Sequence, residues 1–552
     1  MKYKRKYLNL FLIFCFFLVL LASRRWQQII SPQVWDEDGA PTTSCGSNAP
    51  YLGGSNLAGY INDGWQSFFE PVNGYLILVP KIISGISLYA GILNYPLTST
   101  ILAWCFTGLV GLAIYISPTR LKGRLFCAVS VFLIPSNPEV FGLPLYTLWW
   151  SALLLLLLTV WDETRANIAC RLSFLVLGGF SSPIIVLVLP ALYLRAWIFK
   201  ALKSERIIAL LATIIAAVQV SFIIGSGSGE APKLSGILKV IPVFPGNFLL
   251  GNLLGSSGIL WLAGMTISLI LARYLHKNRT DYSAWILVYL LIGSIAFQIF
   301  RVDPALLNPG FAGPRYFFYP FILLFWILIQ SIFTSESRGY RFLLDSILAA
   351  ALVNSIPVWS RQHDDLHWKA HVVSCSLFPD EMTYSIPVHF DGNKDSAWPL
   401  VLKAGICKRL IHGGGSLGVR TYPYAKREFI SKNMPAPDAV LVDSTMKGAD
   451  FERSEFEGFR VVGSFVTSDA DVGEVTLRLR RGSKLLYRSG PGKYGQSISV
   501  LGHEEEFSDE LPVSVNWTVL DFSNSKLPSE FSIKIKDHGT QFGEWSAVAV
   551  RK

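Results

Sequence analysis

Apolar runs that carry no charge constrain the fold of this chain more than any other feature. Three of them are Phe11–Leu21, Ser151–Val160 and Pro320–Ile329. Extended to about 17–25 residues each, such runs are typical of helices that cross a membrane. Only 16% of the 552 residues are charged, whereas soluble globular proteins contain roughly 25%. The sequence therefore predicts a polytopic membrane protein that is mostly α-helical.

The net charge of +10 does not indicate nucleic-acid binding, because the basic residues cluster between the apolar runs. In that arrangement they set the orientation of a membrane protein. The positive-inside rule then predicts about eleven transmembrane helices, with the N-terminus in the cytoplasm and the C-terminus outside. After a first span that ends near Ser23, the expected spans are about 97–116, 125–135 with its flanks, 145–161, 172–182, 183–198, 207–225, 258–274, 284–300, 317–333 and 342–358.

Two segments near the N-terminus each allow two interpretations. Met1–Lys6 is basic and precedes an apolar stretch, as in a cleaved signal peptide, but the many later spans favour an uncleaved anchor. Gly74–Ile92 is expected to be an interfacial helix and not a span. Counting it as a span would place Arg120, Lys122 and Arg124 outside, against the positive-inside rule.

The composition changes near Trp359, where charged and turn-forming residues replace the long apolar runs. We therefore expect a transmembrane domain over residues 1–358, with its first outer loop at about 24–96. A soluble extracytoplasmic domain is expected over residues 359–552.

The last part of this domain, at about 455–552, is expected to be a β-sandwich. Val475, Leu477 and Leu479 alternate with polar residues, and the same period of two recurs over Phe531–Ile535. This alternation is typical of half-buried strands. Turns rich in Gly, Ser, Pro and Asp separate such runs, as they do in β-sandwiches.

The seven cysteines show no metal-binding spacing. Cys375 and Cys407 both fall in the domain expected to be exported and are a candidate disulfide. Cys45 would be left over from that pairing. The other four lie in or beside apolar runs and are expected to be packing residues.

Three consecutive carboxylates, Asp36, Glu37 and Asp38, follow the first span. Like charges repel and raise each other's pKa, so such a group is costly beside a membrane. One interpretation is a solvated loop after an anchor helix. The other is a catalytic base placed where a lipid-borne substrate can reach it.

Basic residues at other predicted outer boundaries suit a phosphate. Arg315 and Arg301 are the candidates, and Lys81 is a weaker one. A lipid phosphate that leaves during glycosyl transfer needs a cation, and arginine supplies one through its planar fork. The alternative is that these arginines are interfacial anchors and that Lys81 is structural.

Three further residues are candidate substrate contacts at the same predicted face: Tyr75, Glu139 and Tyr316. Tyr75 precedes the interfacial segment, and Tyr316 follows Arg315. Glu139 is a single carboxylate at the outer end of a span, where a loop or helix-end role is the alternative.

The order of these short motifs along residues 1–358 resembles that of bacterial GT-C fold glycosyltransferases, and in general layout the O-antigen-modifying glucosyltransferases. The motifs are Trp35-Asp36-Glu37-Asp38-Gly39, Gly74-Tyr75-Leu76, Pro80-Lys81, Pro138-Glu139 and Gly313-Pro314-Arg315-Tyr316-Phe317.

The resemblance implies a multi-pass enzyme of the bacterial inner membrane that takes a sugar from a polyprenyl-phosphate donor at the periplasmic face. The acceptor is then a cell-envelope glycan such as O-antigen in lipopolysaccharide. An acidic residue of the first outer loop serves as the base, which maps onto Glu37 and Asp38, with Asp36 as the third choice. A late arginine that binds the donor phosphate maps onto Arg315. Metal use stays open, because some members use Mg²⁺ or Mn²⁺ and others do not.

Other functions share many of these features. A transporter or flippase for a lipid-linked glycan would place ionisable groups near the membrane midplane, where the expected spans hold almost none. An O-antigen polymerase or ligase would share the spans and the outer arginines, but with a long late outer loop. Membrane acyl transfer would need a histidine near the membrane, and all eight histidines fall outside the expected spans. A non-catalytic scaffold is opposed only by the acidic triplet and the arginines.

Three aromatic residues of the C-terminal domain, Trp517, Trp545 and Tyr494, are of a type that stacks on sugars. Burial in a sandwich core is the favoured interpretation. The role of this domain therefore stays open between glycan binding, capping of the active site and assembly.

Overall fold

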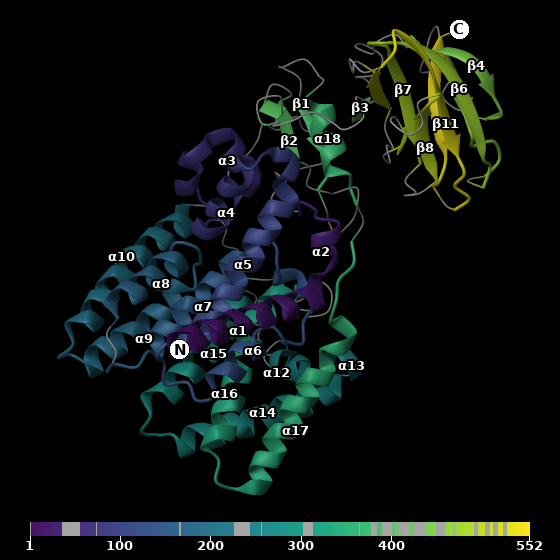
Figure 1. Ribbon diagram of the computed structural model, residues 1–552. Coiled ribbons are helices and arrows are strands. Elements are labelled where there is room, and N and C mark those ends of the chain that lie inside the picture. Colours follow the sequence, from purple (N-terminus) through teal and green to yellow (C-terminus); the bar gives the residue numbers. More distant parts are fainter. Residues whose placement is uncertain are drawn as a thin grey trace. The chain divides into compact units, whose positions relative to one another are not determined.

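The computed structural model of the chain combines a helical part and a C-terminal β-sandwich (Figure 1). The residues that the structure describes are 2–35, 56–72, 74–164, 167–225, 243–254, 257–301, 313–363, 365–376, 383–388, 400–403, 406–407, 410, 419–423, 438–448, 459–468, 470–490, 495–502, 508–511, 517–522, 527–541 and 543–551.

The chain divides into two compact units, each with its own internal contacts. The first unit comprises Met1–Pro32, Gly53–Ile86 and Leu97–His363. The second comprises Gln33–Leu52, Ser87–Pro96 and Asp364–Lys552.

The helical part consists of apolar helices and short helical segments. In chain order these are α1 (Lys2–Arg25), α2 (Gln27–Ile30), α3 (Asn56–Asp63), η2 (Gly64–Phe69), α4 (Leu78–Tyr89), η3 (Ile92–Asn94), α5 (Tyr95–Ile116), α6 (Arg124–Ser130), η4 (Pro138–Val140), α7 (Thr147–Thr159), α8 (Ile168–Gly179), α9 (Ile185–Ile198), α10 (Lys203–Gly225), α12 (Val243–Gly246), η5 (Asn247–Gly251), α13 (Asn252–Leu254), α14 (Ser257–Lys277), α15 (Tyr282–Arg301), η7 (Pro314–Phe317), α16 (Phe318–Thr334), α17 (Arg338–Asn354) and η8 (Ile356–Val358).

Five helical segments of the described chain are long and apolar enough to cross a membrane: Tyr7–Arg25, Ile92–Ile116, Lys203–Ile224, Pro314–Thr334 and Arg338–Val358. Shorter apolar helices accompany them at Leu78–Tyr89, Thr147–Thr159, Ile168–Gly179, Ile185–Ile198 and Tyr282–Gln298. The chain is thus a multi-pass membrane protein by the length and composition of its helices. The expected count of eleven spans is not confirmed.

The expected span at 125–135 is wrong as a single helix. Helix α6 ends at Ser130, and the chain continues through turns to η4, which begins at Pro138. Pro135 and Pro138 explain the break, because proline lacks the N–H that continues a helix and restricts the residue before it. Because of this break, the 131–137 turn places Glu139 beside Tyr146, at the N-terminal end of α7.

Helix α7 is short because protein encloses it. Its 13 residues include a run of six leucines, and only Trp149 among them is not buried. At 1.5 Å per residue it spans about 20 Å, less than the roughly 30 Å of a bilayer core. A helix that is apolar on all sides is typically packed inside other helices, and α7 packs against α8 and α9.

The second unit holds a small helical and strand region before the sandwich. Helix α18 (Trp368–Cys375) and the paired strands β1 (Thr383–Ile386) and β2 (Leu400–Lys403) belong to it. Cys375 and Cys407 form a disulfide here, which confirms that expected pairing. Cys45 lies outside the described residues.

In the part of the chain that the structure describes, the sandwich has two five-stranded antiparallel sheets. One has the order β3 (Val419–Pro423), β10 (Thr518–Phe522), β7 (Lys484–Ser489), β12 (Ser546–Arg551) and β5 (Phe459–Gly463). The other has the order β4 (Val440–Ser444), β6 (Gly473–Arg480), β11 (Glu530–Asp537), β8 (Gln496–Val500) and β9 (Ser508–Glu510). Strands β3 and β4 therefore extend the sandwich to before residue 455, where the sequence placed its start.

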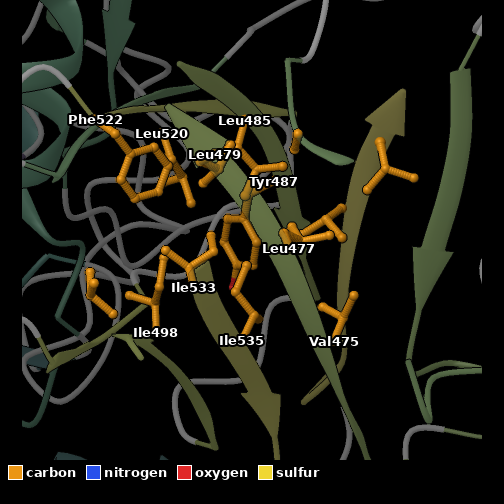
Figure 2. Close-up of a cluster of buried hydrophobic side chains, with 14 of the residues drawn as sticks. Val475, Leu477, Leu479, Leu485, Tyr487, Ile498, Leu520, Phe522, Ile533 and Ile535 are labelled. Atoms are coloured by element: carbon orange, nitrogen blue, oxygen red, sulfur yellow. The ribbon is translucent and has the colours of Figure 1, made fainter. Parts of the chain in front are cut away.

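The sandwich core contains the residues whose alternation predicted it. Val475, Leu477 and Leu479 of β6 are buried, and Ile533 and Ile535 of β11 lie beside them in the cluster shown in Figure 2. The alternation is therefore confirmed in both strands.

The three aromatic residues considered as sugar contacts differ in their surroundings. Trp517 is 1% exposed, as expected for a core residue. Trp545 is half-buried beside Phe465 and Arg488. Tyr494 lies outside the described residues.

Candidate functional site

Arg315 lies in η7, the short segment that leads into α16. Pro314 occupies the first turn of this segment, where its fixed φ suits a helical start and its missing N–H is not needed. The Arg315 side chain is 28% exposed. Its guanidinium also lies over the Tyr316 ring, 5.2 Å from the centroid, a favourable cation–π distance.

Arg315 is held by two residues of the 135–146 region. Its Nη1 donates to Glu139 Oε1 at 2.6 Å and to the Tyr146 hydroxyl at 3.0 Å. Tyr146 in turn donates to Glu139 Oε1 at 2.7 Å. We call Arg315, Glu139 and Tyr146 the Arg315 cluster. Charge-assisted hydrogen bonds of this kind are short and roughly twice as strong as neutral ones.

Glu139 is buried, with 8% of the residue exposed. It lies in η4, whose first residue is Pro138, and so in the segment released by the break after α6. The structure thus brings together two predicted site residues that are 176 positions apart in the sequence.

The end of α1 is fixed against this region by Arg24. Its guanidinium donates to the carbonyl oxygens of Phe132 at 3.1 Å and Ile134 at 2.9 Å, and also to that of Ser136. Its Nε donates to the Trp359 carbonyl oxygen at 3.1 Å. Arg24 therefore ties α1 to the turn before Glu139 and to the segment after α17.

Two more arginines, Arg25 and Arg361, belong to this region. Arg25 is 1% exposed, and its guanidinium interacts electrostatically with Glu139, Tyr146 and Arg361. Arg361 lies in the segment after Trp359. That segment is held beside α2 by His363, whose N–H donates to Gln27 Oε1 at 2.9 Å and whose ring lies 2.7 Å from the Ser31 carbonyl oxygen.

Tyr75 lies in a tight turn and interacts with α16, the helix that follows Arg315. It exchanges two backbone hydrogen bonds with Val72, and Gly74 between them has a φ of 83°, a conformation that glycine adopts without strain. Tyr75 interacts electrostatically with Tyr319, which is one helical turn after Arg315.

Lys81 has a structural position. It is fully buried in α4, and its ammonium donates to the carbonyl oxygen of Ser67 and, at 2.8 Å, to that of Glu70. These bonds fix the end of η2 to α4, so Lys81 does not suit the phosphate-binding role expected from the sequence.

The remaining predicted residues cannot be placed in this arrangement. Asp36, Glu37 and Asp38 lie outside the described residues. Arg301 is the last residue of α15, but the structure does not describe its side chain.

The Arg315 cluster does not fit a divalent metal. Within the described part of the chain, no group of three or more His, Cys, Asp or Glu side chains is arranged to hold a metal ion. Glu139 is accompanied by arginines, which repel a dication. The fit of Mg²⁺ or Mn²⁺ to residues 36–38 is a separate matter, because those residues are not described.

A second group of charged residues lies at the other end of α7, and we call it the Glu205 cluster. Arg171 and Arg195 each form two hydrogen bonds or ion contacts with the Glu205 carboxylate, at 2.8–3.2 Å. All three side chains are at most 1% exposed. Arg195 also donates to the Thr159 carbonyl oxygen at 3.2 Å, which ties the cluster to the last residue of α7.

Arg120 lies beside this cluster. It forms an ion pair with Glu163, lies 3.9 Å from Asp281, and stacks over the Tyr282 ring at 4.7 Å. Burial alone would raise the pKa of the Glu163 carboxyl, but the hydrogen bonds and the charge of Arg120 outweigh it and lower that pKa.

A cavity of about 840 Å³ lies away from the Arg315 cluster. Its lining comes mainly from the first half of α1, the last half of α5 and the start of α8, and includes Arg124, Trp161 and Cys170. None of the predicted site residues contributes to this lining. Its mostly apolar wall between membrane helices suits lipid chains better than a polar reaction.

Sequence reasoning did not identify Arg25, Tyr146 or Arg361. A signal for two of them was present. Arg24 and Arg25 end the first predicted span, and Arg361 follows the last one. In the predicted topology all three therefore fall on the outer side, where the positive-inside rule expects few basic residues. Basic residues that break this rule are candidates for binding an anion.

No protein-family model matches this chain, and no curated protein matches it either. The structure search aligns it with the arabinosyltransferase EmbB from Mycobacterium smegmatis, solved by single-particle cryo-EM. The alignment covers 98% of this chain and 64% of the EmbB chain, with 12% sequence identity and a TM-score of 0.26. This chain thus spans less than two thirds of the length of the EmbB chain. A likeness this distant leaves the function to be argued from the chain's own residues.

Proposed function

We propose that this chain is a membrane glycosyltransferase of the GT-C type. It transfers a sugar from a polyprenyl-phosphate donor to a cell-envelope glycan at the periplasmic face of the bacterial inner membrane. The observation that carries the proposal is the half-exposed Arg315, which Glu139 and Tyr146 hold in a fixed direction.

The membrane placement of this cluster supports the outer face. The end of α1, η4, η7 and the segment after α17 all meet around Arg315 and Glu139. The positive-inside rule independently assigns each of these four segments to the outer side. The charged residues at the other end of α7 come from segments that the same rule assigns to the inside.

The reaction is a single displacement at the anomeric carbon. The acceptor hydroxyl oxygen forms a bond to this carbon, and the bond from the carbon to the phosphate oxygen breaks. The hydroxyl proton passes to a carboxylate of the first outer loop, Glu37 or Asp38 in preference to Asp36. A general base of this kind contributes about a hundredfold or more to the rate. The product sugar has inverted configuration.

Arg315 stabilises the phosphate as the bond breaks. The donor phosphate is a diester with one negative charge, and the leaving lipid phosphate carries two, so the attraction of a fixed guanidinium grows during the reaction. An interaction that strengthens toward the transition state raises the rate of the chemical step. Glu139 and Tyr146 orient the guanidinium, while Tyr316 and Tyr75 are proposed contacts of the donor. Arg301 remains a second proposed phosphate ligand.

Donor turnover by the purified full-length protein tests this function. The protein in detergent is offered a panel of polyprenyl-phosphate sugars, and the wild type is compared with Glu37→Gln, Asp38→Asn and Arg315→Gln. We expect the wild type to consume one donor and at least one carboxamide variant to lose about a hundredfold in rate. Arg338→Gln is the matched control, because Arg338 is exposed at the far end of α17. If folded wild-type protein consumes no donor in the panel, the glycosyltransferase proposal fails.

A further inference from the structure

The cavity of about 840 Å³ lies at the same end of α7 as the Glu205 cluster. Trp161, which follows α7, is fully buried and belongs to its lining. The Arg171 guanidinium of the Glu205 cluster lies 5.9 Å from the centre of the Trp161 ring. All of the lining residues belong to the first compact unit. Ligand sites usually occupy roughly 300–1,000 Å³, so the cavity is large enough to hold one.

The separation of α1 from α5 creates the cavity. A Cβ atom at Gly108 of α5 would lie 2.8 Å from the Phe14 ring of α1. The two helices approach this closely because glycine has no side chain at their contact. One helical turn away from this contact, Leu10 of α1 and Leu112 of α5 line the cavity instead. The space therefore begins where the close contact between the two helices ends.

Helix α8 borders the cavity on a further side, through Cys170 and Phe174. Two lining residues of α5, Leu109 and Ile116, are 55% and 51% exposed. The cavity is therefore open to the surroundings of these helices, and around the spans of a membrane protein those surroundings are lipid chains.

The cationic side chain of the lining comes from Arg124, at the start of α6. Its Nη1 donates to the carbonyl oxygen of Ser117, another lining residue, at 2.5 Å. This bond holds the half-buried guanidinium at the cavity. Among the described residues, no carboxylate forms an ion pair with Arg124, whereas the neighbouring Arg120 is paired with Glu163.

We infer that this cavity binds an anionic phospholipid of the cytoplasmic leaflet, with its phosphate at Arg124 and its chains against α1, α5 and α8. The positive-inside rule assigns the 117–124 segment to the cytoplasmic side. The leaflet on that side is anionic, and basic pockets between membrane helices there bind lipid head groups. The inference is independent of the proposed function, because the Arg315 cluster lies at the other end of α7.

The shape of the cavity favours a two-chained phospholipid over a polyprenyl phosphate. The α5 part of the lining runs from Leu109 to Ile116, which is about 10 Å. This is about a third of the hydrocarbon core of a bilayer. A volume of about 840 Å³ over this length makes the cavity wide and short. Such a space suits the glycerol group and the first part of two chains, whereas a single long chain needs a narrow groove.

Protection of Cys170 from alkylation tests where the lipid binds. Full-length protein in detergent is treated with N-ethylmaleimide, and each cysteine is followed by peptide mass spectrometry. Cys170 lines the cavity, whereas Cys105, also a half-buried free cysteine, does not. With phosphatidylglycerol at about ten times its Kd, Cys170 should react about tenfold more slowly, because about a tenth of the sites stay empty. Cys105 should keep its rate. Absent protection, or equal protection of both cysteines, overturns the inference.

The lipid concentration that half-protects Cys170 tests the head group. Phosphatidylglycerol, which is anionic, is compared at low, constant salt with phosphatidylcholine of the same chains, which has no net charge. The wild type should prefer phosphatidylglycerol about fivefold, the scale of one arginine beside an anionic lipid. Arg124→Gln should bring this ratio near one. The matched control is Arg206→Gln, because Arg206 is exposed and also donates to a backbone carbonyl oxygen, that of Lys200. A wild-type ratio near one, or an unchanged ratio in Arg124→Gln, contradicts the inference.

A substitution in the apolar lining tests the chains separately. Leu109→Trp fills part of the space and should weaken both lipids alike, so the ratio between them should stay at its wild-type value. Ile101→Trp is the control, because Ile101 is exposed on α5 but lies outside the lining. Leu109→Trp and the wild-type ratio keep the test decisive if Arg124→Gln does not fold, as thermal unfolding without lipid will show. Unchanged affinity in Leu109→Trp counts against the inference.

Two further probes distinguish other sources of phosphate. Glycerol 3-phosphate carries a phosphate without chains, and it should not protect Cys170 at the concentrations at which phosphatidylglycerol does. Decaprenyl phosphate should bind more weakly than phosphatidylglycerol. Protection by glycerol 3-phosphate would indicate a site for soluble anions, and tighter binding of decaprenyl phosphate would indicate a polyprenyl site. Either result overturns the assignment to a phospholipid.

Discussion

The two groups of arginines at opposite ends of α7 are built differently. In the Glu205 cluster, Arg171 and Arg195 each approach the same carboxylate with two nitrogens, and all three side chains are at most 1% exposed. In the Arg315 cluster, Nη1 of Arg315 contacts both Glu139 and Tyr146, and the side chain is 28% exposed. α7 separates the two groups by about 20 Å.

The difference suggests how to distinguish a structural arginine from one that binds a ligand. An arginine whose planar fork is matched to a buried carboxylate on two sides has its donors aligned with a partner inside the protein. Such an arrangement joins α8, α9 and α10. An arginine that is oriented by one carboxylate, and that is still open to its surroundings, is arranged to meet an external anion. On the basis of this comparison we propose that one end of α7 stabilises the fold and that the other end binds phosphate.

The largest expected effect is on stability at the Glu205 cluster. Arg195→Met removes one of two arginines from a buried carboxylate, a change that typically costs about 3–5 kcal/mol. We expect a large decrease in the thermal unfolding temperature in detergent, with turnover per folded molecule close to the wild type. Arg206→Met on the exposed side of α10 is the control. A normal unfolding temperature together with lost turnover would reverse the two assignments.

The next effect is on activity at the Arg315 cluster. Arg315→Gln should lower donor turnover by about a hundredfold, equivalent to about 2.7 kcal/mol of transition-state stabilisation. Its unfolding temperature should fall less than that of Arg195→Met, because the Arg315 side chain is partly exposed. Turnover within a few-fold of the wild type would show that Arg315 is an interfacial anchor.

A smaller effect is expected from Tyr146→Phe. The substitution removes the hydroxyl that donates to Glu139 and accepts from Arg315. A hydrogen bond to a charged group contributes about 1.5–3 kcal/mol to stability, but Glu139 still holds the arginine. Turnover should fall about fivefold, mainly through the rate constant, because the arginine is less well oriented. A loss as large as that of Arg315→Gln would instead mean that Tyr146 contacts the reacting groups itself.

The smallest effect concerns the partly exposed pair of Arg120 and Glu163. Arg120→Gln should cost about 1 kcal/mol or less, as is usual for exposed ion pairs. The folded-state pKa of Glu163 is lowered, so the pair stabilises the protein above the unfolded pKa of about 4.3 and loses this contribution as the pH falls through the lower folded value. Unfolding temperatures of the two proteins should differ at pH 7 and converge in acid. A difference that grows in acid contradicts this account.

The sequence predicted the elements whose local pattern repeats and not those that depend on distant contacts. The apolar run of 97–116 corresponds to α5, and the alternation around Leu477 corresponds to β6. The disulfide of Cys375 with Cys407 was also predictable, because both lie in the region expected to be exported.

The rest depended on tertiary structure. Hydropathy averages over Pro135 and Pro138 and so joined α6 to the turn after it. It also cannot tell that Lys81 would donate to the carbonyl oxygens of Ser67 and Glu70. The meeting of Glu139 with Arg315 follows from the packing of η4 against η7, which no local pattern records.

The most direct test of the central claim is a cryo-EM structure of the full-length protein with a bound polyprenyl phosphate. The account predicts density for the phosphate within hydrogen-bond distance, about 3 Å, of the Arg315 guanidinium, with α1 and the segment after α17 beside it. Phosphate density elsewhere, with Arg315 still bound to Glu139 and Tyr146, would contradict the proposal that this end of α7 binds phosphate.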